Sequence, residues 1–345
     1  MKKLYSAVAA ALLLSLASSA PSFADTSTTT TACVQSPTAP NDLGTLTLAS
    51  QIAQLPTVEW GIQQGCFKKY GLTIKTVPVA TSQIGMAGLV GGTYDLVVNT
   101  PTNLLLANGN GNFSGVFVAP RHGYSAEELD RAKIEPFFPG RLLLQTAMIV
   151  GKDSKINTWK DLEHKKVALQ SFKSADHAGT LLAMKAAGAD SKKTEFVTLT
   201  SQQMIDAISR GDVDAVIAND PFATQIVQAG GRVIGYPNAY YAEPGVAVAY
   251  VSDSNVIAKH VAAMRAFQHA TLEINHLLNL KENEATYRKV IAKVTGVTDE
   301  AAAKVRLPVL LEKNLTISDL SYMPSKLKKI GFMRGRVNLT PMLFR

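Results

Sequence analysis

Short apolar runs alternate with segments of helical spacing from Thr45 onward. The apolar runs are rich in Val, Ile, Leu and Thr, a composition that favours strands. We predict strands at residues 45–50, 71–79, 95–99, 115–119, 141–154, 166–171, 195–200, 214–218 and 245–252. Strands that alternate with helices of this length predict βαβ units, a parallel sheet and an α/β fold.

The segments between these strands carry helix start and stop signals. A Pro, or a Ser or Thr that can cap free backbone N–H groups, precedes each segment, and Gly follows several of them. We predict helices at 56–65, at 84–90 after Thr81-Ser82, from Thr100, at 175–187 after Ser174, at 202–210 after Ser201, and at 219–231. From Val256 to the C-terminus the pattern is mainly helical.

One phrase of the sequence occurs twice. GTYDLVVNTP (Gly92–Pro101) is followed about 120 residues later by GDVDAVIANDP (Gly211–Pro221). We interpret each copy as a buried strand that leads into a helix N-terminus at the carboxyl edge of a sheet, which is where open α/β sheets bind ligands. Two copies predict two similar lobes, joined by two extended crossings, that close on a ligand by hinge motion.

Composition agrees with two globular lobes and argues against a nucleic-acid partner. The chain has 345 residues, of which 46% are hydrophobic and 18% charged. That length predicts about two domains, and the composition is far from that of a disordered chain. The formal charge of +8 is spread along the chain, and no basic stripe interleaved with aromatic residues accompanies it.

The N-terminus predicts export. Lys2 and Lys3 precede an apolar run, and Ser22-Phe23-Ala24 resembles a cleavage site, so residues 1–24 are predicted to be a signal peptide cleaved near Ala24. A membrane anchor is the alternative, but the run is shorter than the ~20 residues that a spanning helix needs. We therefore expect a periplasmic protein, with residues 25–44, rich in Thr, Ser and Pro, as a flexible arm.

The two cysteines, Cys33 and Cys66, leave two alternatives open. An oxidising compartment permits a disulfide that joins the arm to the end of the first helix. Two unpaired thiols are the other alternative, since the sequence does not give the distance between them.

Four phrases of the chain resemble a known family. They are EWGIQQGCFKKYGLTIKTVPV, GMAGLVGGTYDLVVNTPTNLLL, SKINTWKDLEHKKVALQS and MIDAISRGDVDAVIANDPFATQIVQAGG. They are similar to periplasmic solute-binding proteins of ABC importers, in the nitrate/sulfonate/taurine group that includes binders of thiamine pyrimidine precursors. The resemblance implies a type II periplasmic-binding-protein fold with a two-strand hinge. It implies lobe I at residues 45–141 plus 244–345, and lobe II at 142–243.

The resemblance also implies where a ligand binds, at loops after the strands and at helix N-termini between the lobes. The implied ligand-binding residues are Gln51, Gln54, Ser82, Gln83, Asn99, Thr100, Arg121, Ser171, Lys173, Ser174, Asn219, Asp220 and Tyr241. Helix N-termini suit an anion, with Lys173 and Arg121 as counter-charges. Asp220 fits a ligand amine, or else it only caps a helix.

The resemblance implies a binding protein and not an enzyme. We expect it to capture a small organic solute, anionic or zwitterionic and similar to a sulfonate or taurine, and to deliver it as a monomer to an ABC permease, without a cofactor or a metal. The alternatives are an aromatic carboxylate or a thiamine pyrimidine precursor as ligand, or an enzyme or a sensor on the same fold. His269, Glu273 and His276 share one helix face, which we interpret as a solvated face, not as a metal half-site.

Overall fold

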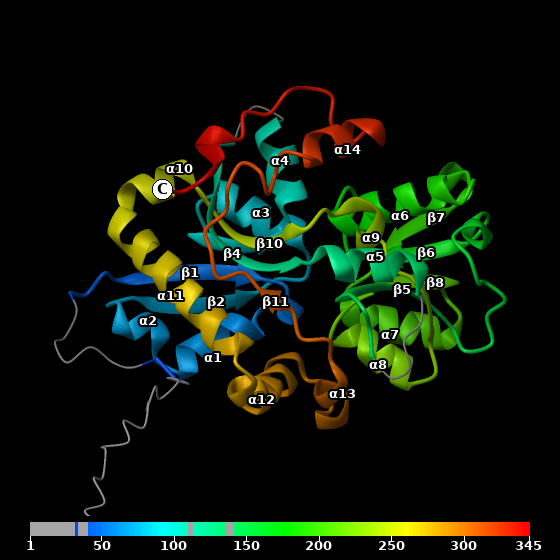
Figure 1. Cartoon of the computed structure of the whole chain (residues 1–345), viewed down its shortest axis with the longest axis horizontal. Coiled ribbons are helices and arrows are strands. Elements are labelled where there is room, and N and C mark those ends of the chain that lie inside the picture. Colours follow the sequence, from blue (N-terminus) through cyan, green and yellow to red (C-terminus); the bar gives the residue numbers. More distant parts are fainter. Residues whose placement is uncertain (1–31, 34–40, 110–112, 136–140) are drawn as a thin grey trace, which may run out of the picture. The chain divides into compact units, whose positions relative to one another are not determined.

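The structure is a computed structural model that describes residues 32–33, 41–109, 113–135 and 141–345 (Figure 1). The predicted signal peptide and most of the predicted arm lie outside these residues. Within them, no helix combines the length and the apolar character needed to cross a membrane.

The first sheet has six strands in the order β11-β4-β10-β3-β1-β2. Its strands are β1 (Thr45–Ser50), β2 (Thr73–Pro78), β3 (Leu96–Asn99), β4 (Gly115–Tyr124), β10 (Gly245–Asp253) and β11 (Val309–Leu310). β1 pairs in parallel with β2 and β3, whereas β10 is antiparallel to both β3 and β4.

The second sheet has five strands in the order β7-β6-β8-β5-β9. Its strands are β5 (Thr146–Val150), β6 (Lys166–Leu169), β7 (Glu195–Thr198), β8 (Ala215–Asn219) and β9 (Arg232–Gly235). β6 is parallel to β7 and β8, and β5 is antiparallel to β8 and β9. Each sheet therefore has three parallel strands followed by an antiparallel one, so both sheets are mixed and the prediction of parallel sheets holds only in part.

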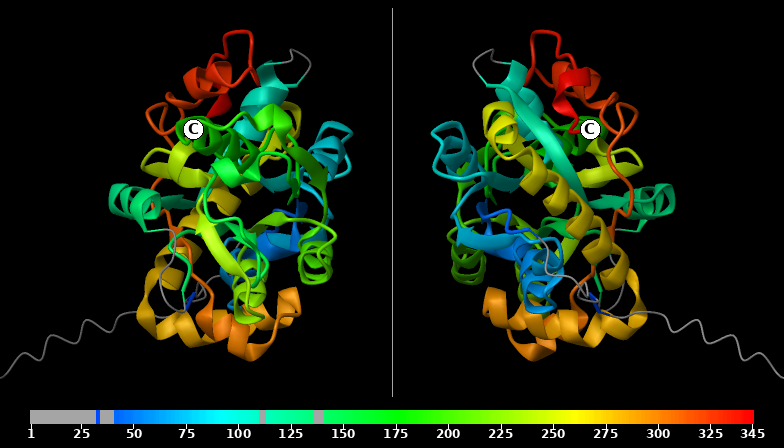
Figure 2. Two further views of the ribbon diagram at one scale, coloured as in Figure 1. Left: turned by 90° about the vertical axis from the view of Figure 1, so that its right-hand side faces the viewer. Right: turned by 90° about the vertical axis from the view of Figure 1, so that its left-hand side faces the viewer.

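The helices between the strands agree with most of the predicted segments. They are α1 (Pro56–Gln63), α2 (Cys66–Lys69), α3 (Ser82–Val90), α4 (Pro101–Gly109), α5 (Ala126–Ile134), α6 (Ala175–Ala186), α7 (Ser201–Arg210), α8 (Phe222–Gln228), α9 (Asn238–Tyr241), α10 (Ser254–Lys259), α11 (Val261–Asn279), α12 (Glu284–Thr295), α13 (Asp299–Lys304) and α14 (Met323–Lys329). The N-cap of α7 is Thr200 and not Ser201, because Thr200 and Gln203 form a reciprocal capping box. The long helix α11 packs against β4 (Figure 2).

The bounds of two predicted strands were wrong. The strand predicted at 115–119 extends to Tyr124, because β4 pairs with β10 along its whole length. The strand predicted at 141–154 is only Thr146–Val150, where its neighbours β8 and β9 end. Strand length is set by the pairing partner, which lies far away in the sequence.

The repeated phrase has the same local structure in both sheets. Gly92 and Gly211 adopt positive φ angles of 72° and 76°, which L side chains rarely adopt. Asp95 Oδ2 then accepts hydrogen bonds from the backbone N and Oγ1 of Thr47, at 2.7 Å each. Asp214 Oδ2 accepts one from the backbone N of Lys166, at 2.8 Å. In each sheet the repeated Asp thus ties its strand to the start of the neighbouring parallel strand.

Two paired strands connect the two sheets. Tyr124, at the end of β4, pairs with Gly245, at the start of β10. A Cβ at Gly123 would lie 2.1 Å from the carbonyl oxygen of Gly245, so this close approach requires glycine. The pairing matches the two-strand hinge expected from the sequence. Beyond it, Leu129 and Ala132 of α5 are buried in the same cluster as the strands of the second sheet.

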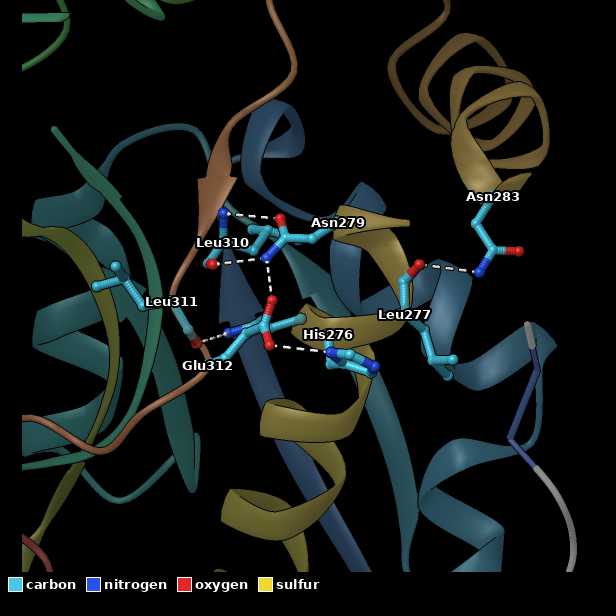
Figure 3. A network of polar contacts seen from close by, with 8 residues as sticks. His276, Leu277, Asn279, Asn283, Leu310, Leu311 and Glu312 are labelled. Atoms are coloured by element: carbon cyan, nitrogen blue, oxygen red, sulfur yellow. Dashed lines mark hydrogen bonds and ion pairs between the residues drawn. The ribbon is translucent and has the colours of Figure 1, made fainter. Parts of the chain in front are cut away.

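The C-terminal segment is anchored to α11 by polar side chains (Figure 3). Asn279 exchanges two hydrogen bonds with the backbone of Leu310, and its Nδ2 also donates to Glu312. His276 Nδ1 lies 2.9 Å from Glu312 Oε2. The fully buried Asn275 donates to the carbonyl of Leu311 at 2.7 Å. Farther along the same segment, Lys326 Nζ donates a hydrogen bond to the backbone carbonyl of Tyr241.

The two cysteines form a disulfide, Cys33–Cys66. Both are buried in a hydrophobic cluster that includes residues of α1, α11 and α12. The bond therefore joins the end of the N-terminal arm to α2, as one of the two sequence alternatives predicted.

Candidate functional site

A cavity of about 70 Å³ lies where the carboxyl ends of strands from both sheets meet several helix N-termini. The cavity therefore has room for several water-sized groups. Such a cavity suits a small solute.

The wall from the first sheet presents hydrogen-bond donors. Asn99, the Asn of the first repeated phrase, is buried, and its Oδ1 accepts from the backbone N of Thr100 (2.8 Å) and from Asn103 Nδ2 (2.7 Å). Two donors, Asn99 Nδ2 and Gln51 Nε2, are buried without a partner among the described residues, as are the hydroxyl of Thr100 and one acceptor, Gln54 Oε1. Unpaired buried polar atoms are costly, so these groups are suited to bind polar atoms of a solute.

His122 adds a ring nitrogen to the same wall. It lines the cavity from β4, is buried, and its Nδ1 lies 2.6 Å from Nη1 of Arg121. Burial and the Arg121 charge hold the pKa of His122 well below its usual range, so the ring is neutral.

The wall from the second sheet carries a carboxylate. Asp176 lies in the first turn of α6, and its Oδ1 accepts from Asn238 Nδ2 at 3.1 Å. Burial raises the pKa of Asp176 above its ordinary value. Asn238 Oδ1 is buried without a partner in the described part of the chain. Asn219 of the second repeated phrase also lines this wall, but its amide is committed to Gln170 (2.8 Å) and to Thr146.

Three tyrosines complete the lining. The Tyr241 hydroxyl is 2.7 Å from Oγ1 of Thr102, and its ring contacts that of Tyr322 at a centroid distance of 6.3 Å. Burial raises the pKa of Tyr124, Tyr241 and Tyr322, so all three are neutral. Their rings supply apolar surface, and each ring carries a hydroxyl group that can form a hydrogen bond.

At one edge of the cavity the two halves touch through α3 and the loop after β6. Gln83 Nε2 donates to the carbonyl of Phe172 at 3.2 Å, and Ser171 Oγ donates to Gln83 Oε1. Ser82 Oγ and Ser171 Oγ are 3.3 Å apart. These contacts join α3 to the loop after β6 across that edge of the cavity.

The structure brings most of the residues expected at the site into one place. Gln51, Gln54, Ser82, Asn99, Thr100, Ser171, Ser174, Asn219 and Tyr241 all line the cavity. Gln83 lies at the contact between the halves instead of in the lining.

Three charged residues expected at the site do not line it. Arg121 is buried behind His122 and donates to Thr57 Oγ1 at 2.9 Å. Lys173 is exposed beside another surface hollow. Asp220 accepts from the backbone N of Thr224 and from that of Arg306, so it acts as a helix N-terminal acid. Burial raises the pKa of Asp220 to about 6.

Sequence reasoning missed several lining residues, among them His122, Tyr124, Gln145, Thr146, Gln170, Asp176, Asn238 and Tyr322. Asp176 had a usable signal, because it lies two residues after the N-cap Ser174. His122 and Asn238 had none, because they reach the cavity only through the crossing strands and α9.

The face of α11 considered as a metal half-site is occupied otherwise. Glu273 accepts from Lys69 Nζ (2.6 Å) and from the Tyr70 hydroxyl (3.0 Å). Among the residues with described positions, no group of three His, Cys, Asp or Glu side chains could hold a metal ion.

The model of the NMT1-like family matches residues 45–294. The chain belongs to the NMT1-like family. The match spans most of the chain and includes both repeated phrases. A search of curated protein sequences finds no match.

Solved structures show the fold of this NMT1-like protein. The alkanesulfonate-binding protein SsuA from Xanthomonas axonopodis pv. citri, bound to MOPS, is 17% identical with a TM-score of 0.70, over 87% of this chain and 98% of that one. A Candida albicans protein described as having the generic periplasmic binding protein fold is 15% identical with a TM-score of 0.63, over 87% and 96%. The desulfurization enzyme DSZB is 12% identical with a TM-score of 0.62, over 87% and 96%. The family and the periplasmic-binding-protein fold expected from the sequence are confirmed.

Proposed function

We propose that this protein is an extracytoplasmic solute-binding protein that captures a small zwitterionic solute, such as the aminosulfonate taurine, and delivers it to an ABC permease. The family and the fold support a binding role. The solute class follows from the opposite polarity of the two cavity walls.

The observation that carries the proposal is this polarity. The first wall offers two unpaired amide nitrogens, those of Gln51 and Asn99, against one unpaired carbonyl oxygen, that of Gln54, and the buried cation of Arg121 lies behind His122. The second wall offers the carboxylate of Asp176 and the unpaired carbonyl oxygen of Asn238. An anionic group fits the first wall and an ammonium group fits the second, because each then meets unlike charge in a poorly hydrated site.

Among the residues with described positions, no Lys or Arg side chain lines the cavity. A solute with only a strong negative charge would face Asp176 without compensation. A zwitterion satisfies both walls, and its ammonium group also stabilises the ionised form of Asp176.

The arrangement of the lobes supports delivery to a permease. We propose lobe I at residues 45–141 plus 244–345, and lobe II at 142–243, as the resemblance implies. The contacts of Gln83 with Ser171 and Phe172 then join the lobes only when the cavity is closed. A transporter could distinguish loaded from empty protein by the surface that closure creates.

Thermal unfolding of the mature protein against a solute panel tests the proposal. The panel contains taurine, an amine-free alkanesulfonate, nitrate, an aromatic carboxylate and an aminopyrimidine. A ligand at 100 times its Kd should stabilise the fold by about 2.7 kcal/mol, which is a rise in Tm of roughly 4 °C for a chain of this length. We expect the largest rise with the zwitterion. If only the aromatic carboxylate or only the aminopyrimidine raised Tm, the proposed solute class would be wrong. If no member of the panel raised Tm, the proposal would be contradicted.

A further inference from the structure

Arg121 is a buried cation without a carboxylate partner in the described part of the chain. Its side chain is 3% exposed. Nη1 contacts His122 Nδ1 at 2.6 Å, and Nη2 donates to Thr57 Oγ1 at 2.9 Å. The Thr57 hydroxyl in turn lies 2.9 Å from the hydroxyl of Tyr287. A buried charge held only by neutral groups is costly, which calls for a reason beyond packing.

The contact with Arg121 determines which nitrogen of His122 carries the proton. A guanidinium has only donors, so Nδ1 must accept and the proton must lie on Nε2. His122 is neutral, because burial and the neighbouring charge keep its pKa well below the usual range. His122 lines the cavity, and the side-chain hydrogen bond of its ring among the described residues involves Nδ1 and not Nε2. The free ring nitrogen is therefore a fixed N–H donor at the cavity.

Within the described ranges, no acid forms a hydrogen bond or an ion pair with His122. Arg121 is the charged group in contact with it, and the ring of Tyr124 meets it edge-on at a centroid distance of 6.2 Å. Tyr250 on the neighbouring strand is neutral, because burial raises its pKa. Asp176, the carboxylate of the cavity, belongs to the opposite wall and bonds to Asn238.

We propose that Arg121 is a positioning residue for solute recognition: it locks His122 in the Nε2–H tautomer, so that His122 donates to the anionic group of the solute. The buried charge of Arg121 polarises the imidazole and strengthens that donor in the low-dielectric site. The pair thus selects for an acceptor-bearing end of the solute. This inference rests on the proposed zwitterionic solute for its binding consequence, but the tautomer itself does not.

The tautomer is tested in the unliganded wild-type protein by ¹⁵N NMR of the imidazole nitrogens. We expect the protonated-nitrogen shift at Nε2 and the unprotonated shift at Nδ1, unchanged between pH 6 and pH 8. A protonated Nδ1, or titration of His122 near its ordinary pKa of about 6.5, would overturn the inference. This result does not depend on any ligand, so it separates the inference from the proposed function.

Binding then tests the consequence with the variants Arg121→Met and Arg121→Lys. Loss of the donor and the charge in Arg121→Met should release the tautomer and weaken taurine binding about 10- to 100-fold. It should also introduce a pH dependence, with tighter binding at lower pH as His122 becomes able to protonate. Arg121→Lys should restore the tautomer and most of the affinity, because an ammonium also donates to Nδ1.

Lys173→Met is the matched control, since it removes one exposed positive charge outside the cavity lining. We expect its affinity to stay within about twofold of wild type. Equal losses in Lys173→Met and Arg121→Met, or no loss in Arg121→Met, would show that Arg121 does not position His122 for the solute. If Arg121→Met does not fold, the tautomer measured in the wild type and the taurine affinity of Arg121→Lys still test whether Arg121 positions His122.

Discussion

Asp176→Asn is the substitution that tests the polarity of the cavity most directly. Asp176 lines the second wall, and its Oδ1 accepts from Asn238 at 3.1 Å. Asparagine has nearly the same shape and keeps an oxygen for that hydrogen bond. The substitution therefore removes the negative charge and leaves the packing of α6 intact.

The expected loss of affinity follows from the interaction removed. A hydrogen bond that involves a charged group contributes about 1.5–3 kcal/mol. Each 1.4 kcal/mol is a factor of ten in Kd, so taurine binding should weaken about 10- to 150-fold. Ethanesulfonate lacks the ammonium group and so makes no ion pair with Asp176. It should bind the variant as well as the wild type or better, because the substitution removes the repulsion between its sulfonate and the Asp176 carboxylate.

The pH dependence has a definite sign. Burial raises the pKa of Asp176, so the unliganded protein holds a proton there to a higher pH than a free Asp does. An ammonium group favours the carboxylate, so taurine affinity should rise with pH through this raised pKa, and binding should release protons. Asp176→Asn should abolish both effects.

Isothermal titration calorimetry in buffers of different ionisation enthalpy measures the affinity and the proton release together. Asp206→Asn is the control, because Asp206 is an exposed acid on α7 outside the cavity. Equal losses for taurine and ethanesulfonate in Asp176→Asn would refute the reasoning, since they would show a structural effect and not recognition of the amine.

Three further outcomes are expected. Gln83→Ala, which removes the contact with Phe172, should weaken all solutes equally, by about 3- to 10-fold and mainly through faster dissociation, in stopped-flow measurements. A preference for one solute in that variant would place Gln83 in recognition instead of closure. Replacing Cys33 and Cys66 by Ser should lower the free energy of unfolding by about 3 to 4 kcal/mol for a loop of 33 residues without changing solute affinity, as denaturant titration and calorimetry would show. Burial raises the pKa of Asp220 to about 6 in the folded protein. Between about pH 4 and pH 6, Asp220 is therefore protonated in the folded state and ionised in the unfolded state. The free energy of unfolding should fall as the pH rises through this range. The difference in unfolding free energy between wild type and Asp220→Asn should fall by up to about 3 kcal/mol over that range, two pKa units at 1.36 each, and a constant difference would contradict the raised pKa.

Much of the fold follows from local signals in the sequence. The repeated Gly–Asp–apolar–Asn phrase predicts two equivalent strand-to-helix units, because glycine permits the turn and Asn suits a strand end. The caps at Thr81 and Ser174 lie where predicted, since a capping side chain bonds within three residues of itself. The end of each such strand then determined much of the cavity lining, including Asn99 and Asn219.

The sequence could not determine how strands separated by more than a hundred residues pair. β10 inserts between β3 and β4, and β5 lies between β8 and β9, so both sheets are mixed. These pairings depend on the energy of the assembled sheet and leave no local periodicity. The same pairing extended β4 to Tyr124 and brought His122 to the cavity.

The charged residues show most clearly what only the tertiary structure decided. Arg121 lies at a register shift between β4 and β10, where Val248 pairs with His122 and Ala249 with Pro120, so the alternation of a regular strand does not place its side chain. The sequence identified Arg121 as a candidate cation of the site and Asp220 as an acid near the start of a helix. The register of β4 and the packing of Arg306 put Arg121 behind His122 and turned Asp220 away, which left Asp176 as the acid of the site.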